Sequence, residues 1–459
     1  MFFGMIHKFN MFGKNFVLDV ESGALHLVDD LTYEMLSHIK AKDFEDEKTA
    51  INGLCLKLKQ TEKEEILQRF NELKFLFEQK ILFSEQNLED YKKIVEQSYI
   101  KAICLHVAHD CNLRCKYCFA ATGDFNLGRK LMPYNISKLA IDFLIEKSGN
   151  RRNLEVDFFG GEPLLNFDVV KQTVEYAKKI EKEKNKNFRF TITTNGVLLD
   201  EEKINFINEN MVNVVLSLDG RKMVNDKMRI TENKKGSYDL ILPKFKQLVN
   251  SRKNKDYFVR GTFTRYNLDF AEDFKDIYNQ GFDNISIEPV VCEKEKEYAI
   301  QEEDLPKIFK EYEKLVEYII KERKTNKKLN FFHYNLDFSQ GPCIIKRLRG
   351  CGCGCEYLAI SPEGDIYPCH QFVGEEKWKM GNLIEKQFNE KLKEDFSKIN
   401  LLNKKECLNC WAKYYCSGGC NANNFKYAKD MLRPYDLSCK MERKRVEAAI
   451  ALKFFEKQI

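Results

Sequence analysis

The sequence predicts an α/β protein whose central part is a partial (β/α)6 TIM-type barrel. Between Ala102 and Glu322, six segments with strand character alternate with helical segments. Such repeats favour a parallel sheet with right-handed crossovers. Four short motifs directly follow the first four strands. The carboxyl ends of parallel strands share one edge, so the motifs are expected on one rim, where these folds place their chemistry.

The alternation of apolar residues and turn signals gives the order of the central elements. The strands are predicted at residues 102–107, 154–159, 188–194, 212–217, 257–264 and 284–289. The helices between and after them are predicted near residues 133–147, 168–184, 201–210, 237–250, 268–279 and 303–322.

The first 85 residues are predicted to form a small domain of their own. Three short alternating segments, near residues 5–11, 15–20 and 24–28, indicate a three-stranded sheet. Helical patterns follow near residues 31–38, 49–59 and 63–79. This order resembles a winged-helix arrangement. Residues 86–98 are expected to link it to the barrel of residues 99–325.

Residues 326–459 form the third predicted region, which is rich in cysteine and glycine. Ten of the sixteen cysteines lie between Cys343 and Cys439. Only short elements are expected here, with little apolar material for a core. We therefore expect bound metal to organise this region.

Composition excludes several classes of protein. With 75 basic and 70 acidic residues, the net charge of +5 is too balanced to indicate a nucleic-acid or membrane partner. The first residues lack the apolar core of a signal peptide, and no apolar run is long enough to span a bilayer. A cytoplasmic location is expected, and clustered thiols in a reducing compartment indicate metal binding or catalysis.

Three cysteines follow the first barrel strand in a C-x3-C-x2-C spacing: Cys111, Cys115 and Cys118. Three thiolates can bind three irons of a 4Fe-4S cluster, which leaves the fourth iron without a protein ligand. An open position is typical of catalytic metal sites.

Together with "GGEP" after the second strand and "SLDG" after the fourth, this motif resembles the radical S-adenosylmethionine (SAM) family. The resemblance implies that SAM chelates the fourth iron. Glycines permit close approach, a glutamate accepts from an ammonium and an arginine pairs with a carboxylate. By resemblance, the SAM contacts are Tyr117 at the adenine, Gly160, Gly161 and Glu162 at the amino group, Ser217, and Arg229 at the carboxylate.

The later cysteines resemble the SPASM extension of that family, which implies two auxiliary 4Fe-4S clusters and three clusters in all. The resemblance assigns Cys407, Cys410, Cys416 and Cys439 to the outer cluster, and Cys353, Cys369 and Cys420 to the inner one. The remaining inner ligand stays open between Cys343, Cys351, Cys355 and a vacant iron. A vacant iron could bind a substrate thiolate.

The family's chemistry is reductive cleavage of SAM to a 5'-deoxyadenosyl radical, which abstracts a hydrogen atom. The N-terminal domain resembles the precursor-peptide recognition element of peptide maturases, which takes a leader peptide as an added strand at the edge around residues 24–28. Over its full length the chain resembles the maturases of six-cysteines-in-forty-five-residues (SCIFF) peptides. These enzymes install cysteine sulfur-to-carbon thioethers, which give ranthipeptides.

This resemblance implies a precursor peptide and an electron donor such as ferredoxin or flavodoxin as partners. It also implies a sequence of events in which the substrate cysteine binds the inner cluster, and carbon–sulfur bonding returns an electron there. The nearest alternative is another SPASM peptide or protein modifier, such as a formylglycine-type dehydrogenating maturase or an epimerase. A more distant alternative is a binding protein whose thiols hold structural zinc.

Overall fold

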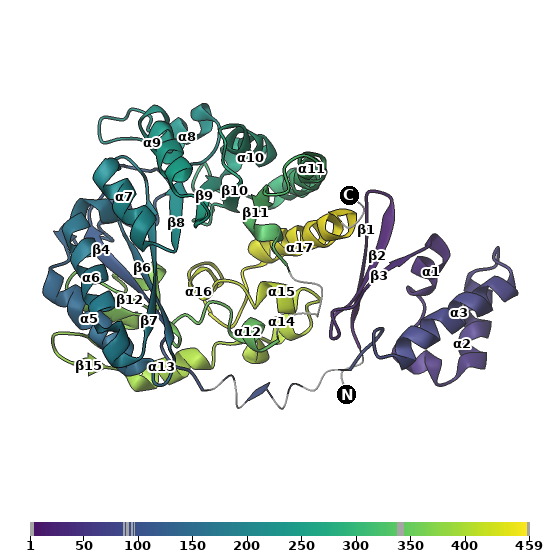
Figure 1. Cartoon of the computed structure of the whole chain (residues 1–459). Helices are drawn as coiled ribbons and strands as arrows, with labels where there is room; N and C mark the ends of the chain where they lie inside the picture. Colours follow the sequence, from purple (N-terminus) through teal and green to yellow (C-terminus); the bar gives the residue numbers. More distant parts are fainter. Residues whose placement is uncertain are drawn as a thin grey trace.

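The computed structural model describes residues 4–85, 88, 91, 92, 95, 97–336 and 344–456. Figure 1 shows the barrel-like sheet on one side and the N-terminal unit on the other, with helices of the C-terminal region between them. The predicted division into domains stays a prediction, and much of the expected linker at residues 86–98 lies outside the described residues.

The N-terminal unit has the predicted order of strands and helices. Its antiparallel sheet has the order β1-β2-β3. Val17 of β2 packs against the helices, whereas its neighbours Phe16 and Leu18 face the main core of the molecule. β2 is therefore buried on both faces. The winged-helix classification stays a prediction. The elements are β1 Ile6–Met11, β2 Lys14–Asp19, β3 Leu25–Val28, α1 Asp30–Met35, α2 Glu47–Lys57 and α3 Lys63–Glu78.

The N-terminal unit docks on the C-terminal region through aromatic and charged contacts. The ring of His7 stacks on Trp411 at 3.6 Å between centroids, and its Nε2 lies 2.9 Å from a carboxylate oxygen of Glu447. The buried Lys413 pairs with Glu21 at 2.6 Å. These contacts hold the unit beside the thiol-rich region.

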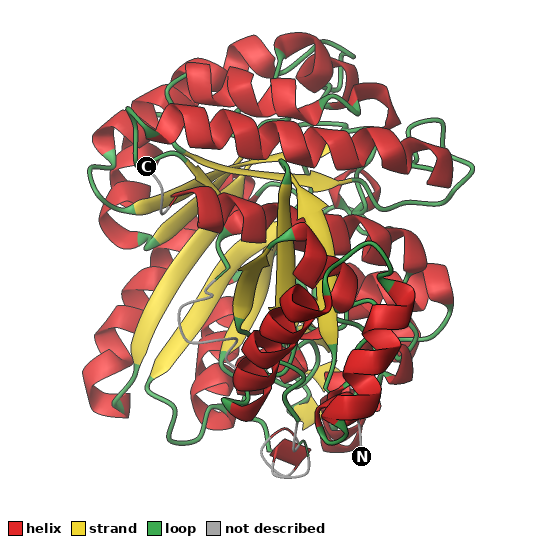
Figure 2. Cartoon of the chain, turned by 90° about the vertical axis from the view of Figure 1, so that its right-hand side faces the viewer, coloured by secondary structure: helices red, strands yellow, loops and turns green. Residues whose placement is uncertain are grey.

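The central strands are parallel, as predicted. The sheet runs in the order β11-β10-β9-β8-β7-β6-β4, and Figure 2 shows its strands side by side among the surrounding helices. Leu154, Val156 and Phe158 alternate along β6 and pack into the core formed with the helices. The strands are β4 Ala102–His109, β6 Asn153–Gly160, β7 Asn187–Thr194, β8 Asn213–Ser217, β9 Asp256–Phe263, β10 Asn284–Pro289 and the unpredicted β11 Asn330–Phe331.

The barrel helices also agree closely with the prediction, apart from the short α8, which the sequence did not indicate. They are α5 Tyr134–Lys147, α6 Phe167–Lys184, α7 Glu201–Asn210, α8 Lys222–Met228, α9 Tyr238–Ser251, α10 Phe270–Asn279 and α11 Leu305–Arg323. A two-residue strand, β5 Lys130–Leu131, pairs with the end of β4.

The C-terminal region continues the barrel sheet. β12 pairs in parallel with β4, with Leu358 opposite Ile103, and β13, β14 and β15 follow in antiparallel order. Its elements are α12 Ile344–Arg349, β12 Tyr357–Ile360, β13 Asp365–Tyr367, β14 Gly381–Asn382, β15 Gln387–Phe388, α13 Glu390–Ser397, α14 Lys405–Leu408, α15 Lys413–Cys416, α16 Asn421–Ala428 and α17 Asp436–Glu456.

The expectation of only short elements in this region is wrong for α17. This helix has 21 residues, and Ala448, Ile450 and Leu452 are buried in the main core. It lies beside α11 of the barrel (Figure 1). Within the described residues, every helix is too short or too polar to cross a membrane.

Candidate functional site

The thiol loop at residues 111–118 leaves the sheet at the end of β4 and is tied to the segment after α8. The backbone N–H of Lys116 donates to the carbonyl of Met228 at 2.9 Å, and that of Arg114 donates to Ile230 at 2.6 Å. The loop therefore lies against the residue that follows Met228, which is Arg229.

The thiol of Cys111 faces the neighbouring strand ends. Its sulfur accepts weak hydrogen bonds from the backbone of Leu113 at 3.4 Å and from the side-chain amide of Asn195 at 3.5 Å. Burial raises the pKa of Cys111 to about 12 and that of Cys115 to about 11, where the Arg229 charge acts in the opposite direction. Binding of iron must therefore displace protons from these thiols.

The glycine pair after β6 is required by the packing of the backbone itself. A Cβ atom on Gly160, whose φ is +120°, would lie 2.2 Å from the carbonyl oxygen of Ala108. A Cβ on Gly161 would lie 2.1 Å from the carbonyl oxygen of Asp110. The two glycines therefore allow the end of β6 to pack directly against the start of the thiol loop. This packing requires glycine at both positions independently of any contact with SAM.

Glu162 joins the ends of β6 and β7. Its buried carboxylate accepts hydrogen bonds from the Leu164 backbone at 3.1 Å, the Thr194 hydroxyl at 2.7 Å and the Asn195 backbone at 2.8 Å. Burial raises its pKa to about 7, although these hydrogen bonds favour the ionised form. A cationic group placed beside Glu162 would favour ionisation further.

Asp219, within "SLDG", is the centre of the next contact set, and its role was not predicted from the sequence. Its carboxylate accepts from the Tyr117 hydroxyl at 2.6 Å, Arg229 Nε at 3.0 Å and the Thr262 backbone at 3.0 Å. The Arg229 guanidinium lies 5.5 Å from the centroid of the Tyr117 ring. Asp219 therefore joins Tyr117 and Arg229, two of the predicted SAM contacts. A third, Ser217, is the last residue of β8, two positions before Asp219.

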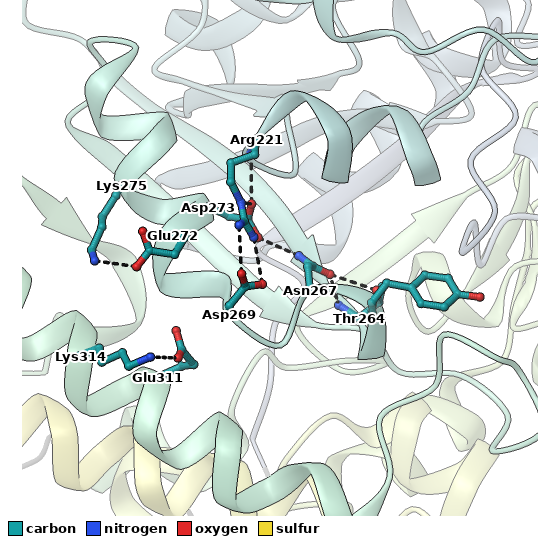
Figure 3. Close-up of polar contacts among 10 residues, drawn as sticks. Arg221, Thr264, Asn267, Asp269, Glu272, Asp273, Lys275, Glu311 and Lys314 are labelled. Carbon is teal, nitrogen blue, oxygen red and sulfur yellow. Dashed lines mark hydrogen bonds and ion pairs between the residues drawn. The ribbon is translucent and has the colours of Figure 1, made fainter.

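The turn after Asp219 is fixed by an ion-pair network around the buried Asp273, drawn in Figure 3. A Cβ on Gly220 would lie 2.3 Å from Asp273 Cβ. Arg221 donates to Asp273 at 2.8 Å and makes two hydrogen bonds of 2.9 Å to Asp269. The side-chain amide of Asn267 donates a further hydrogen bond to the Asp273 carboxylate at 2.9 Å. The network holds the Asp219 turn against the loop after β9.

The outer group of thiols surrounds a cavity of about 80 Å³. Its cysteines come from α14, the following turn, α15 and α17, and they include all four residues assigned to the outer cluster. They are Cys407, Cys410, Cys416 and Cys439.

The inner group brings together the predicted Cys353, Cys369 and Cys420, and adds Cys351. A hydrogen bond between the Cys353 and Cys369 thiols, together with burial, raises the pKa of Cys353, and the charges of Cys351 and Cys420 act in the same direction. Cys355 instead donates to the Gly352 carbonyl at 3.5 Å. Cys343 lies outside the described residues.

Among the described residues, no three potential ligands stand close enough to hold a single metal ion. The thiols of the outer group surround a cavity instead of one point. A 4Fe-4S cluster has separate irons at its corners, each with its own thiolate, so thiols spaced around a cavity fit such a cluster better than a lone zinc ion.

Two protein-family models match parts of this chain. A model of the radical SAM superfamily matches residues 105–277, and one of the SPASM iron-sulfur cluster-binding domain matches residues 351–411. An uncharacterized protein of Methanocaldococcus jannaschii is 30% identical over 276 residues, which are 60% of this chain and 86% of that protein. This chain belongs to the radical SAM superfamily.

Further relatives of this radical SAM enzyme are named maturases and synthases. The cysteine-type anaerobic sulfatase-maturating enzyme of Clostridium novyi is 28% identical over 333 residues, 68% of this chain and 86% of that protein. The radical SAM cyclopropyl synthase TigE of Paramaledivibacter caminithermalis is 25% identical over 442 residues, 87% of this chain and 84% of that protein.

Two solved structures share the radical SAM fold of this chain. The structure of anSMEcpe with bound AdoMet has a TM-score of 0.65 and 20% identity, covering 78% of this chain and 96% of that one. Streptococcus suis SuiB bound to precursor peptide SuiA has a TM-score of 0.53 and 18% identity, covering 93% of this chain and 96% of that one. A radical SAM enzyme with a SPASM domain uses SAM and several 4Fe-4S clusters.

Replacing Arg221 with alanine is expected to lower the free energy of unfolding of this radical SAM enzyme by about 3–5 kcal/mol, because Asp273, with its side chain 0% exposed, loses its cationic partner. Urea unfolding followed by circular dichroism measures the change. Lys275→Ala is the matched control. Its partner in Figure 3, Glu272, is 47% exposed where Asp273 is buried, so the loss of Lys275 should change stability by about 0.5 kcal/mol or less. Equal losses of stability in both variants would contradict the prediction that Arg221 stabilises the fold by pairing with the buried Asp273.

Proposed function

We propose that this radical SAM enzyme joins a cysteine sulfur to a carbon of another residue in a ribosomally made, cysteine-rich precursor peptide. Bound SAM and its reduced cluster, held at Cys111, Cys115 and Cys118, supply a 5'-deoxyadenosyl radical that removes one hydrogen atom. The peptide loses two hydrogens in all: one as the hydrogen atom that the radical removes and one as the proton of the cysteine thiol. The electron that remains when the carbon–sulfur bond forms would pass to the inner cluster.

The placement of the inner thiols beside the SAM-cluster loop carries this proposal. Phe119 follows Cys118 directly, and its ring lies 5.5 Å from that of His370, which follows Cys369. Phe159 of β6 lies 5.2 Å from the same imidazole. The parallel pairing of β12 with β4 fixes this arrangement. A peptide cysteine held at the inner group would therefore stand close to where the radical is made.

The inner group contains Cys351 as well as the three assigned cysteines, which bears on the vacant-iron hypothesis. Cys351 and Cys420 are exposed, whereas Cys353 and Cys369 are buried. We propose that Cys351 occupies the outward-facing side of the inner cluster, where a peptide thiolate would replace or accompany it. Soft iron favours either sulfur ligand.

The N-terminal unit supports a peptide substrate and is proposed to bind the leader. β3 is an edge strand of the described three-stranded sheet, because it pairs with β2 on one side and with no strand on the other. Its Leu27 is 43% exposed. An added peptide strand would pair with β3 and cover Leu27. The solved SuiB complex contains its own precursor peptide, SuiA.

Leu27→Glu is expected to weaken leader binding at least tenfold, about 1.4 kcal/mol, because a charge replaces apolar surface that the leader would cover. Fluorescence anisotropy with a labelled leader peptide measures the affinity. Leu56→Glu is the control: Leu56 is 72% exposed and lies on α2, away from the β3 edge. Unchanged binding in Leu27→Glu would argue against this edge.

Anaerobic incubation with SAM, dithionite and a cysteine-rich precursor peptide tests the proposed reaction. Tandem mass spectrometry should find a product that has lost two hydrogens, resists alkylation at one cysteine and lacks fragment ions between the joined residues. A reaction without SAM is the control. A product with every cysteine still open to alkylation would overturn the thioether.

Formylglycine-type oxidation is the second candidate, favoured by the 28% identity to the sulfatase-maturating enzyme of Clostridium novyi. It would create an aldehyde that a hydrazide probe labels, without a crosslink. Against this candidate, TigE and SuiB, which are not named as sulfatase maturases, align over 87% and 93% of this chain, whereas the Clostridium novyi enzyme aligns over 68%. The hydrazide probe applied to the same product separates the two reactions.

A further inference from the structure

A lysine is buried between the two auxiliary groups of thiols. Lys404 is 1% exposed, and no carboxylate in the described part of the chain pairs with it. Its Nζ donates to the carbonyl of Gly418 at 2.8 Å and to the side-chain oxygen of Asn421 at 2.8 Å. Both partners are neutral, so they satisfy hydrogen bonds without balancing the charge. An unbalanced buried charge is costly.

The backbone that receives this ammonium connects the outer group to the inner group. Gly418 lies in the turn between Cys416 and Cys420, and Ser417, Gly418 and Gly419 all have positive φ, at 60°, 81° and 73°. A Cβ on Gly418 would lie 2.8 Å from Lys404 Cδ and 3.2 Å from its Nζ. The turn is therefore shaped around the lysine side chain.

Cysteines of both groups act on this lysine. Burial lowers the pKa of Lys404, and the negative charges of Cys407, Cys416, Cys420 and Cys351 oppose that shift. The first two belong to the outer group and the last two to the inner group. Once bound iron has displaced their protons, the thiolates of both groups would help to balance the ammonium.

A second buried lysine shows that the chain can balance such a charge with a carboxylate. Lys413 is also buried, but it pairs with Glu21 at 2.6 Å. The side-chain partner of Lys404 is instead Asn421, the uncharged counterpart of aspartate. The partners of Lys404 are neutral, so its positive charge can act on the thiol groups on either side.

We propose that Lys404 is a positioning residue whose buried positive charge raises the reduction potentials of both auxiliary clusters. One-electron reduction makes a cluster more negative by one charge, and a fixed cation nearby in a low-dielectric interior favours that reduced form. The proposal rests on the assignment of the outer and inner thiols to two clusters, and not on thioether formation.

Lys404→Met tests the proposal in the full enzyme with its clusters reconstituted. A dithionite redox titration followed by electron paramagnetic resonance gives the potential of each cluster. Both auxiliary clusters should become harder to reduce, each with an equilibrium constant at least tenfold lower, about 59 mV for one electron. The SAM cluster should keep its potential. Lys405→Met is the matched control, because water and salt screen that exposed neighbour.

Asn421→Asp gives an independent variant that keeps the lysine and the shape of its partner. The new carboxylate would neutralise the ammonium in place, and both auxiliary potentials should again fall. Unchanged potentials in this variant, a shift in only one auxiliary cluster, or an equal shift in the SAM cluster would each overturn the proposal. Loss of iron from Asn421→Asp would show a structural role and overturn it as well.

Iron and sulfide analysis of the unaltered enzyme separates this proposal from its premise. Iron for several clusters with unshifted potentials refutes the role of Lys404 alone. Iron for only one cluster refutes the assignment of the auxiliary thiols. Neither result depends on finding the peptide substrate, so the thioether proposal is tested separately.

Discussion

Cys115→Ala is expected to abolish the reductive cleavage of SAM. The substitution removes one of the three thiolates of the loop. Backbone hydrogen bonds from Arg114 and Lys116 to residues 228–230 hold this loop in place. The thiol at position 115 lies near Arg229, Cys118 and Asp219, whose charges act on its pKa, and its own charge acts on the pKa of Cys111. A cluster with two remaining thiolates loses the ligand set that holds it.

The measurement is 5'-deoxyadenosine formed with dithionite under anaerobic conditions, which should fall below detection. Cys55→Ala in α2 is the matched control and should keep full cleavage, because that cysteine lies in the N-terminal unit. Cys416→Ala, in the outer group, should keep some SAM cleavage but no longer modify peptide. Cleavage by Cys115→Ala above a tenth of the unaltered rate would contradict the assigned role.

Asp219→Asn is expected to have the second-largest effect. Asp219 is 1% exposed and joins Tyr117 to Arg229, so its neutralisation leaves a buried guanidinium without its carboxylate. Breaking a buried ion pair in this way costs about 3–5 kcal/mol of stability. Displacement of Tyr117 and Arg229 by about an ångström would lower the rate of SAM cleavage about 10²-fold.

Unfolding in urea and 5'-deoxyadenosine formation measure the two effects of Asp219→Asn. Asp239→Asn removes a carboxylate whose partner, Lys222, is itself exposed, and it should leave both quantities nearly unchanged. Normal SAM cleavage by a destabilised Asp219→Asn enzyme would limit the role of Asp219 to folding.

The barrel strands could be predicted because their periodicity is local. Along β6, Leu154, Val156 and Phe158 alternate with polar residues and meet the helices on one face. The long helix α17 could not be predicted in the same way, since its buried side chains face α11, more than 100 residues earlier in the chain. The pairing of β12 with β4 is likewise a contact between distant segments.

The spacing of the thiols indicated which cysteines belong together, but not what surrounds them. Asp219 is one of 70 acidic residues, and its role depends on Tyr117, 102 positions away, folding back to meet it. Lys404 is similarly one of many lysines until the turn at Gly418 encloses its side chain. The glycine motif was recognised from the sequence, whereas the backbone contacts that require it are visible only in the fold.

The continuous sheet from β11 to β15 also decides how this chain could be divided. Ala102–Leu105 of β4 are paired on one side with β6 and on the other with β12. A barrel produced without the C-terminal region would expose the backbone groups of β4 along an open edge, which invites pairing between molecules and aggregation. Fragments intended to isolate the SAM cluster must therefore carry the β12–β13 hairpin with them.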